Sequence, residues 1–382
     1  MNPFRSLLHL LPYRTRRFSR KLLARLKNLY NEPTQPMIWV YGLPEGIQIT
    51  RLNQICREQF GAPVKRARHY HLSGWKEAGA YRMKILLENG KEQHLVFKNA
   101  VYNDAQIPAL SGFPILPGLP EFEIYQKGRV ALQDLLPKIY DIEEVVSKRQ
   151  YRYIFENLWE NYHILNSPEW KLRFVEHLPR VHQALANLTD SIDPNNVLRF
   201  DREFSSALEK YALENLNRYA QTHESADLCR LFEMWPRLHE MHLRDEVDAL
   251  QPPVLIHGDL NFSNAFFHRS DRSRIRLVDW EWAGYGFPHA DLAALLKGTA
   301  PEIEEEALRI YAMNYPQISP ADHQRIYSWC MLERSLNDAA FLAAQVIDSD
   351  HAAKIDLPGT IEKSIRRMLA LLDRMEDPVM RG

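Results

Sequence analysis

Two acidic residues follow two apolar strands within the segment 254–282, and this arrangement constrains the fold more than any other part of the chain. The apolar run 254–256 predicts a short strand that delivers Asp259 into a loop. After a polar turn, a second strand-like run at 274–278 leads directly to Asp279. If the two carboxylates act together, the fold must bring the ends of both strands to one place.

Asn264, five residues after Asp259, adds an amide oxygen to these carboxylates. Hard Mg²⁺ accepts carboxylate and amide oxygens and usually keeps waters and substrate phosphates in its remaining positions. We interpret Asn264 and Asp279 as metal ligands, which leaves Asp259 for an acceptor molecule. Taken singly, such residues more often cap loops and helices. Their joint spacing and strand context favour the functional interpretation.

The dipeptide Asn89-Gly90 separates two runs with strand character. Asn-Gly is a strong signal for a two-residue hairpin turn, because both turn positions need a positive φ. The register of such a hairpin pairs Met83 with Val96 and Tyr81 with Lys98. Alternation along the strands then places Met83 and Val96 on the same sheet face as Lys98. We therefore expect an apolar patch beside a lysine.

Upstream of this hairpin, Ser73 and Gly74 lie in a glycine-containing segment that enters a strand. Backbone N–H groups of such a segment could bind phosphates. Neither the dinucleotide fingerprint nor the Walker A spacing is present, so an ordinary turn is an equal alternative.

A change of pattern near residue 158 divides the chain. Strand-like runs precede this point and helical periodicity follows it. At about 150 residues per domain, 382 residues suffice for two large lobes. We predict an α+β chain with an N-terminal helix in residues 1–33, a β-rich lobe at 34–157 and a helical lobe at 158–382.

Residues 1–33 contain eight Lys or Arg and one acid, whereas the whole chain has a net charge of -1. Residues 14–30 form a basic amphipathic pattern, which fits either contact with an anionic membrane surface or packing on the protein's own first lobe. The packing interpretation is favoured. An organellar transit peptide is a third reading, opposed by the small number of serines.

Composition excludes several classes of protein. The three cysteines form no short-spaced pair, so a disulfide framework and a cysteine-based zinc site are excluded and a cytoplasmic setting is expected. If the basic helix binds a membrane, we expect the protein to be peripheral, at the inner face of that membrane. No run approaches the roughly 18 to 20 apolar residues of a spanning helix. Nucleic-acid binding is disfavoured because the basic residues concentrate in one short helix. The oligomeric state stays open.

The motifs of the C-terminal half resemble those of a known family. They read His-Gly-Asp-Leu-x-x-x-Asn at 257–264, Leu-Val-Asp-Trp-Glu-Trp at 277–282 and Gly-x-Gly-x-Pro-x-x-Asp at 284–291. This pattern is similar to the aminoglycoside phosphotransferase and choline kinase superfamily, relatives of the eukaryotic-type protein kinases. The resemblance implies a protein-kinase-like two-lobe fold, with a small β-rich N-lobe, a large helical C-lobe and ATP between them.

The resemblance also implies residue roles. Lys98 would contact the α- and β-phosphates of ATP and be held by Glu121. Asp259 would orient and deprotonate the acceptor hydroxyl, while Asn264 and Asp279 would hold Mg²⁺.

The same resemblance assigns the adenine contact to the backbone of Glu156, Asn157 and Leu158. The expected patch of Met83 and Val96 beside Lys98 would then cover the adenine ring. Asp291 would support the catalytic loop. Glu123 competes with Glu121 for the lysine, and only the distance to a following tyrosine favours Glu121.

The acceptor is less well defined. Glu281 and Trp282 adjoin the metal ligand Asp279 and are candidate acceptor contacts, and the helical lobe offers further aromatic and acidic residues. A binding site lined by aromatic and acidic residues suits a cationic or sugar-like substrate. More commonly, however, such aromatics belong to the core and such acids to a solvated surface.

We predict an ATP- and Mg²⁺-dependent phosphotransferase acting on the hydroxyl of a small molecule such as an amino alcohol, aminoglycoside or sugar. The alternatives are an inactive nucleotide-binding scaffold and an atypical protein kinase.

Overall fold

The computed structural model describes residues 40–72, 79–101, 118–146, 150–164, 167–240, 243–348 and 357–376. The predicted basic helix within 1–33, including residues 14–30, lies outside the described residues, as do Ser73 and Gly74.

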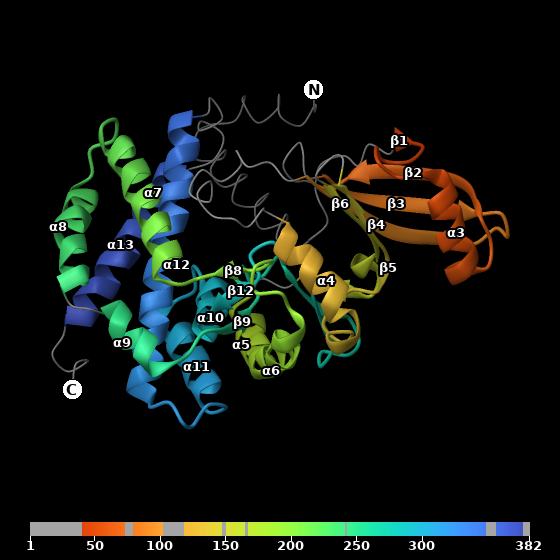
Figure 1. The fold of residues 1–382 in the computed structure, drawn as a ribbon. Helices are drawn as coiled ribbons and strands as arrows, with labels where there is room; N and C mark the ends of the chain where they lie inside the picture. Colours follow the sequence, from red (N-terminus) through yellow and green to blue (C-terminus); the bar gives the residue numbers. More distant parts are fainter. Residues whose placement is uncertain are drawn as a thin grey trace, which may run out of the picture.

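The N-terminal part is an antiparallel sheet with one helix on each face (Figure 1). Six described strands pair in the order β1-β2-β3-β4-β6-β5. They are β1 (Val40–Tyr41), β2 (Val64–His71), β3 (Gly79–Leu87), β4 (Glu92–Val101), β5 (Ile139–Val145) and β6 (Gln150–Glu156). Helix α3 (Ile49–Phe60) packs its apolar side on one face. Helix α4 (Leu119–Ala131) covers the other, where Phe122 stacks on Tyr151 of β6.

The β3–β4 hairpin forms as predicted, but the predicted register is wrong by one residue. Met83 pairs with Leu95 rather than with Val96, and Ala80 pairs with Lys98. The cause is the turn. Gly90 has a positive φ of 83°, whereas Asn89 does not and instead accepts a hydrogen bond from the Lys91 N–H through its side chain (3.1 Å). The connection therefore has three residues with glycine at the left-handed position.

This shift moves Met83 to the opposite face of the sheet. Met83 is fully buried in the cluster that α3 completes, with Leu52 and Cys56. Val96 keeps its place on the Lys98 face because the two residues are two positions apart on one strand. Arg82, the partner of Val96, takes the place that the sequence assigned to Met83.

The C-terminal part is mostly helical (Figure 1), so the predicted α+β organisation is confirmed. A short 3₁₀ turn, η3 (Leu158–Glu160), follows β6 directly. The described helices are α5 (Pro168–Val175), α6 (Leu178–Leu188), α7 (Arg202–Ala220), α8 (Ala226–Glu240), α9 (Leu243–Leu250), α10 (Pro288–Leu296), α11 (Pro301–Ala312), α12 (Pro320–Asp348) and α13 (Leu357–Glu376). None of them is long and apolar enough to cross a membrane.

Two small sheets position the loops of interest. Their strands are β7 (Tyr162–His163), β10 (Ala265–His268) and β11 (Ile275–Leu277) in one, and β8 (Leu198–Arg199), β9 (Val254–Ile256) and β12 (Gly284–Gly286) in the other. The β9–β10 loop carries residues 257–264, and residues 278–283 follow β11. A hydrogen bond from the Val278 N–H to the Asn264 carbonyl (3.0 Å) joins the two segments.

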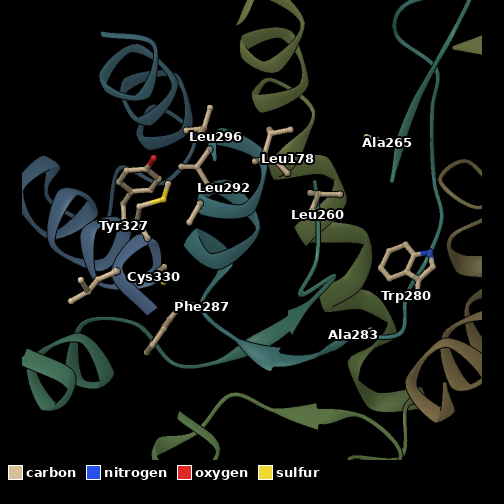
Figure 2. Close-up of a cluster of buried hydrophobic side chains, with 14 of the residues drawn as sticks. Leu178, Leu260, Ala265, Trp280, Ala283, Phe287, Leu292, Leu296, Tyr327 and Cys330 are labelled. Atoms are coloured by element: carbon tan, nitrogen blue, oxygen red, sulfur yellow. The ribbon is translucent and has the colours of Figure 1, made fainter. Parts of the chain in front are cut away.

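The main hydrophobic core anchors both segments. Figure 2 shows Leu260 and Trp280 within this cluster, together with Ala283, Leu292 and other apolar side chains. Leu260 and Trp280 are completely buried. The polar residues between these anchors are thus carried on a fixed backbone.

Candidate active site

Lys98 of β4 lies at the centre of a cluster of three carboxylates, one from α4 and two from the loop after β11. Its Nζ is 2.8 Å from Oε2 of Glu121 on α4 and 2.7 Å from Oδ1 of Asp279. Oε1 of Glu281, two residues further along the loop after β11, lies 3.1 Å from the same nitrogen. The fold thereby brings the predicted lysine, its glutamate and the second aspartate into direct contact, although Lys98 and Asp279 are 181 residues apart.

Lys98 and the surrounding carboxylates favour each other's charged forms, against the effect of burial. Burial disfavours the ammonium of Lys98, but Asp279, Glu121 and Glu281 outweigh it and raise the Lys98 pKa well above its usual value. Burial raises the pKa of Glu121 to about 7, against the opposing effect of Lys98. Desolvation also opposes the charge on Asp279, yet Lys98 and His257 lower the Asp279 pKa below its ordinary value. A cation is therefore firmly held here.

The choice between the two glutamates of α4 is resolved by their hydrogen bonds. Glu123 accepts from the Asp193 N–H (3.1 Å) and from Nδ2 of Asn196 (3.2 Å), on the side of the helical region. Glu121 is completely buried against Lys98.

Asp259 lies in the β9–β10 loop with both carboxylate oxygens engaged. Oδ2 accepts from Nδ2 of Asn261 (3.0 Å) and Nδ2 of Asn264 (3.3 Å). Oδ1 lies 2.5 Å from Nη2 of Arg334, a residue of α12. Arg334 was not predicted, because no local pattern in the sequence connects the middle of a long helix to a loop 75 residues earlier.

Among the residues that the structure describes, oxygens of Glu121, Asp279 and Glu281 lie within 4.8 Å of one another and could hold a metal ion. Carboxylates of this kind fit Mg²⁺. Asn264, the other predicted ligand, turns its amide nitrogen to Asp259, and its Oδ1 accepts from Oγ of Ser263 (3.3 Å). Glu281, predicted as an acceptor contact, lies in the Lys98 cluster.

Trp282, the other predicted acceptor contact, packs partly buried in a small apolar cluster. That cluster contains Leu198, Phe200 and Phe204.

Asp291 at the first turn of α10 holds the loop that carries Asp259. Its carboxylate accepts from the backbone N–H groups of His257 (3.0 Å) and Gly258 (2.8 Å) and contacts Nε2 of His182 (3.2 Å). Asp291 is completely buried, and burial opposes its charge, but His182 and His257 lower its pKa below the usual value. This geometry fits the supporting role that the sequence indicated.

Strained backbone occurs at the same place. Asp279 is the one non-glycine residue with a positive φ (68°) in the described chain. Gly258 has a φ of 79°, and a Cβ there would lie 1.9 Å from the Trp282 carbonyl oxygen. Both residues therefore depend on a conformation that most side chains disfavour.

The predicted nucleobase contacts Glu156, Asn157 and Leu158 lie at the end of β6 and directly after it. Oε1 of Glu156 accepts from the Lys138 N–H (2.8 Å), and Leu158 begins η3. The Asn157 amide, with its oxygen toward Arg82, accepts from Nε and Nη2 of that residue at 3.1 Å each. Arg82 also donates to the Tyr70 hydroxyl (3.0 Å). The sequence did not predict Arg82 here because the assumed register was wrong.

The comparisons with known proteins agree with this geometry. Residues 172–329 match the model of the phosphotransferase enzyme family, APH. The predicted family resemblance is confirmed. No match was found among the curated protein sequences.

Solved APH-family structures share the fold. Aminoglycoside 2'-phosphotransferase-IIIa in its GDP complex has a TM-score of 0.55 at 13% identity, over 84% of this chain and 99% of that one. An aminoglycoside phosphotransferase from Alicyclobacillus acidocaldarius has a TM-score of 0.54 at 12% identity, over 93% and 100%. A thermostable mutant of aminoglycoside phosphotransferase APH(4)-Ia has a TM-score of 0.52 at 18% identity, over 85% of this chain and 99% of that one. The chain therefore has a kinase-like fold.

Proposed function

We propose that this protein transfers the γ-phosphate of a nucleoside triphosphate, with ATP as the predicted donor, to the hydroxyl of a small molecule. The observation that carries the proposal is the triple contact of Lys98 with Glu121, Asp279 and Glu281. Phosphoryl transfer needs a positioned cation for the phosphates and carboxylates for a metal ion, and the APH match supports the same reaction class. The GDP bound to aminoglycoside 2'-phosphotransferase-IIIa supports nucleotide binding by this fold.

Lys98 would neutralise the non-transferred phosphates, with Glu121 keeping its ammonium in place. Asp279 together with Asn264 or Glu281 would hold Mg²⁺, which supplies charge neutralisation of the phosphate oxygens when it is bound. The segment 156–158 would receive the nucleobase. In this proposal the boundary between the two lobes follows residue 157, and residues 1–33 form a separate segment.

Asp259 would act on the acceptor. Its carboxylate orients the acceptor hydroxyl and takes the proton as the oxygen attacks the γ-phosphorus. The bond between that phosphorus and the bridging oxygen breaks, and the nucleoside diphosphate leaves with the electron pair. Because the transition state of this transfer is loose, positioning contributes more than strong base chemistry.

The test is a comparison of Asp259→Asn with wild type. The assay measures nucleoside diphosphate release with amino alcohols, sugars and aminoglycosides as acceptors, and nucleotide affinity is titrated separately. Loss of the base should lower turnover by about 10²- to 10⁴-fold with nucleotide affinity little changed. Asp271→Asn, in the exposed turn between β10 and β11, is the matched control and should behave like wild type.

Three results would contradict the proposal. Equal turnover in Asp259→Asn and wild type would remove Asp259 from the reaction. Binding of nucleotide without acceptor-dependent turnover in the wild type would favour the inactive scaffold, and phosphate on a protein side chain would favour a protein kinase.

A further inference from the structure

We propose that the acceptor carries an oxyanion, a phosphate or a carboxylate, close to its reactive hydroxyl, and that Arg334 binds this group. The inference rests on the proposed function and narrows its substrate class. It argues against the cationic one of the two acceptor types, cationic or sugar-like, that the aromatic and acidic residues of the sequence suit.

The first observation is the position of Arg334. Its Nη2 contacts Oδ1 of Asp259, and its Nε lies 3.4 Å from Oδ2 of Asp338, one helical turn along α12. The side chain is 26% exposed, and its guanidinium lies next to the proposed base. A guanidinium has five donors in a planar fork, which matches phosphate and carboxylate oxygens.

A second cation lies on the same side. Nζ of Lys297, a residue just after α10, lies 2.6 Å from Oδ2 of Asp338. The Lys297 side chain is 47% exposed. Arg334 and Lys297 thus share one carboxylate, Asp338, and Arg334 also contacts Asp259. When the acceptor hydroxyl takes its place at Asp259, Arg334 loses that partner, and an oxyanion on the acceptor would replace it.

The third observation concerns the acidic residues that a cationic acceptor would need. Glu281 is bound to Lys98, and Glu333 lies 3.4 Å from Nη1 of Arg244. Glu304 is paired with the guanidinium of Arg367 and accepts from the Tyr327 hydroxyl (3.2 Å). These three acids of the helical lobe therefore already have cationic partners within the protein.

The consequence for selectivity is electrostatic. An ammonium group near the reactive hydroxyl would meet a like charge on Arg334 and find its usual carboxylate partners occupied. An oxyanion at the same position would accept two parallel hydrogen bonds from the guanidinium. The transfer step itself is unchanged, since the proton still passes to Asp259.

The test measures binding to the full-length protein saturated with Mg²⁺ and ADP, so that the nucleotide site is filled. The probes are glycerol 3-phosphate, glucose 6-phosphate and gluconate, their neutral parents glycerol and glucose, and the cations ethanolamine and glucosamine. Calorimetry should detect at least one oxyanion probe binding at least tenfold more tightly than its neutral parent. With ATP in place of ADP, the same probe should stimulate ADP release.

The variants are Arg334→Gln, Arg334→Lys and the control Arg309→Gln. Arg309 is an exposed residue of α11 that pairs with Glu306. Arg334→Gln should reduce oxyanion affinity at least tenfold, whereas Arg334→Lys should retain part of it and Arg309→Gln all of it. Unfolding midpoints show whether each variant is folded. If Arg334→Gln does not fold, the inference is tested with Arg334→Lys, which keeps the charge.

Three outcomes overturn the inference. They are the absence of oxyanion binding in the wild type, equal binding in Arg334→Gln, and tighter binding of the cationic probes. Failure of the proposed function gives a different result, because the protein would then not bind Mg²⁺ and ADP or would release no ADP with any acceptor.

Discussion

At the scale of single residues, Glu121 and Glu123 of α4 show how two positions along a helix separate two environments. Two residues correspond to about 200° around an α-helix, so the side chains point to different sides. Glu121 meets Lys98 of the sheet, and Glu123 accepts hydrogen bonds from residues 193 and 196. The same residue type is therefore part of the site at one position and a structural support at the other.

This separation predicts opposite effects for matched substitutions. Glu121→Gln should weaken nucleotide binding about tenfold, because Lys98 loses the carboxylate that holds it. Glu123→Gln should leave nucleotide affinity unchanged and lower the free energy of unfolding by about 1 kcal/mol. Nucleotide titration and urea unfolding measure the two quantities. An equal loss of affinity in both variants would contradict the assignment.

At the scale of elements, the β9–β10 loop depends on one glycine. Gly258 and Gly61, which follows α3, have the same φ of 79°, but a Cβ at Gly61 would meet nothing within 4 Å. A Cβ at Gly258 would overlap the Trp282 carbonyl. Alanine substitutions at the two positions therefore distinguish the free-energy cost of a left-handed backbone from that of a steric clash.

We expect Gly61→Ala to lower the free energy of unfolding by about 1 kcal/mol, the usual cost of a left-handed alanine. Gly258→Ala should cost about 4 kcal/mol or more, because backbone atoms must move as well. Chemical unfolding of both variants measures the difference. Similar losses would mean that the loop can shift freely around Asp259.

A pair of buried histidines couples α10 to α12. Nε2 of His289 lies 2.9 Å from Nδ1 of His323, and both rings are almost completely buried. Burial lowers the pKa of each ring below 6.5. The neighbouring His323 and His182 lower the pKa of His289 further. At His323, the Tyr315 carbonyl and Asp322 raise the pKa and so partly oppose the effect of burial. Both rings are thus neutral in the folded protein at neutral pH.

This pair predicts a loss of stability in acid. Because the folded pKa lies below the unfolded value of 6.5, the contribution is present above pH 6.5 and is lost as the pH falls below it. His289 alone should contribute a slope of up to about 1.4 kcal/mol per pH unit. His289→Gln should have a shallower slope between pH 6.5 and 5 in urea unfolding. An unchanged slope would show that this pair does not titrate on unfolding.

The sequence predicted those features that local pattern determines. The strand before Asp259, the strand before Asp279 and the change from strands to helices all follow from periodicity and composition. The hairpin register was wrong because the Asn89 side chain bonds to the backbone and shifts the turn by one residue. Arg82 was missed because of this register error. Arg334 was missed because its partner Asp259 is brought near only by tertiary packing.

At the scale of the whole molecule, Lys98 joins the β-rich region to the helical one. Lys98 and Glu121 belong to the first, and Asp279 and Glu281 follow β11 in the second. Other contacts cross the same boundary, including the hydrogen bond from the Leu277 N–H to the Leu135 carbonyl (2.7 Å). Removing the lysine therefore affects both the site and the contact between the regions.

Lys98→Met should lower the free energy of unfolding by about 3 kcal/mol or more, because it leaves the buried Glu121 without its cation. The double variant Lys98→Met with Glu121→Gln should recover part of this loss, since the uncompensated buried charge is also gone. A double-mutant cycle by urea unfolding measures the coupling. Additive losses would contradict it.

The lysine that would receive a triphosphate already has three carboxylates in contact, so nucleotide entry is an exchange of ionic partners and not the meeting of free charges. The electrostatic contribution to the binding free energy is then the difference between two states, in both of which Lys98 is paired with anionic groups. Affinity should consequently fall less steeply with added salt than the charge of the triphosphate alone would indicate, which the slope of log Kd against log salt concentration would measure.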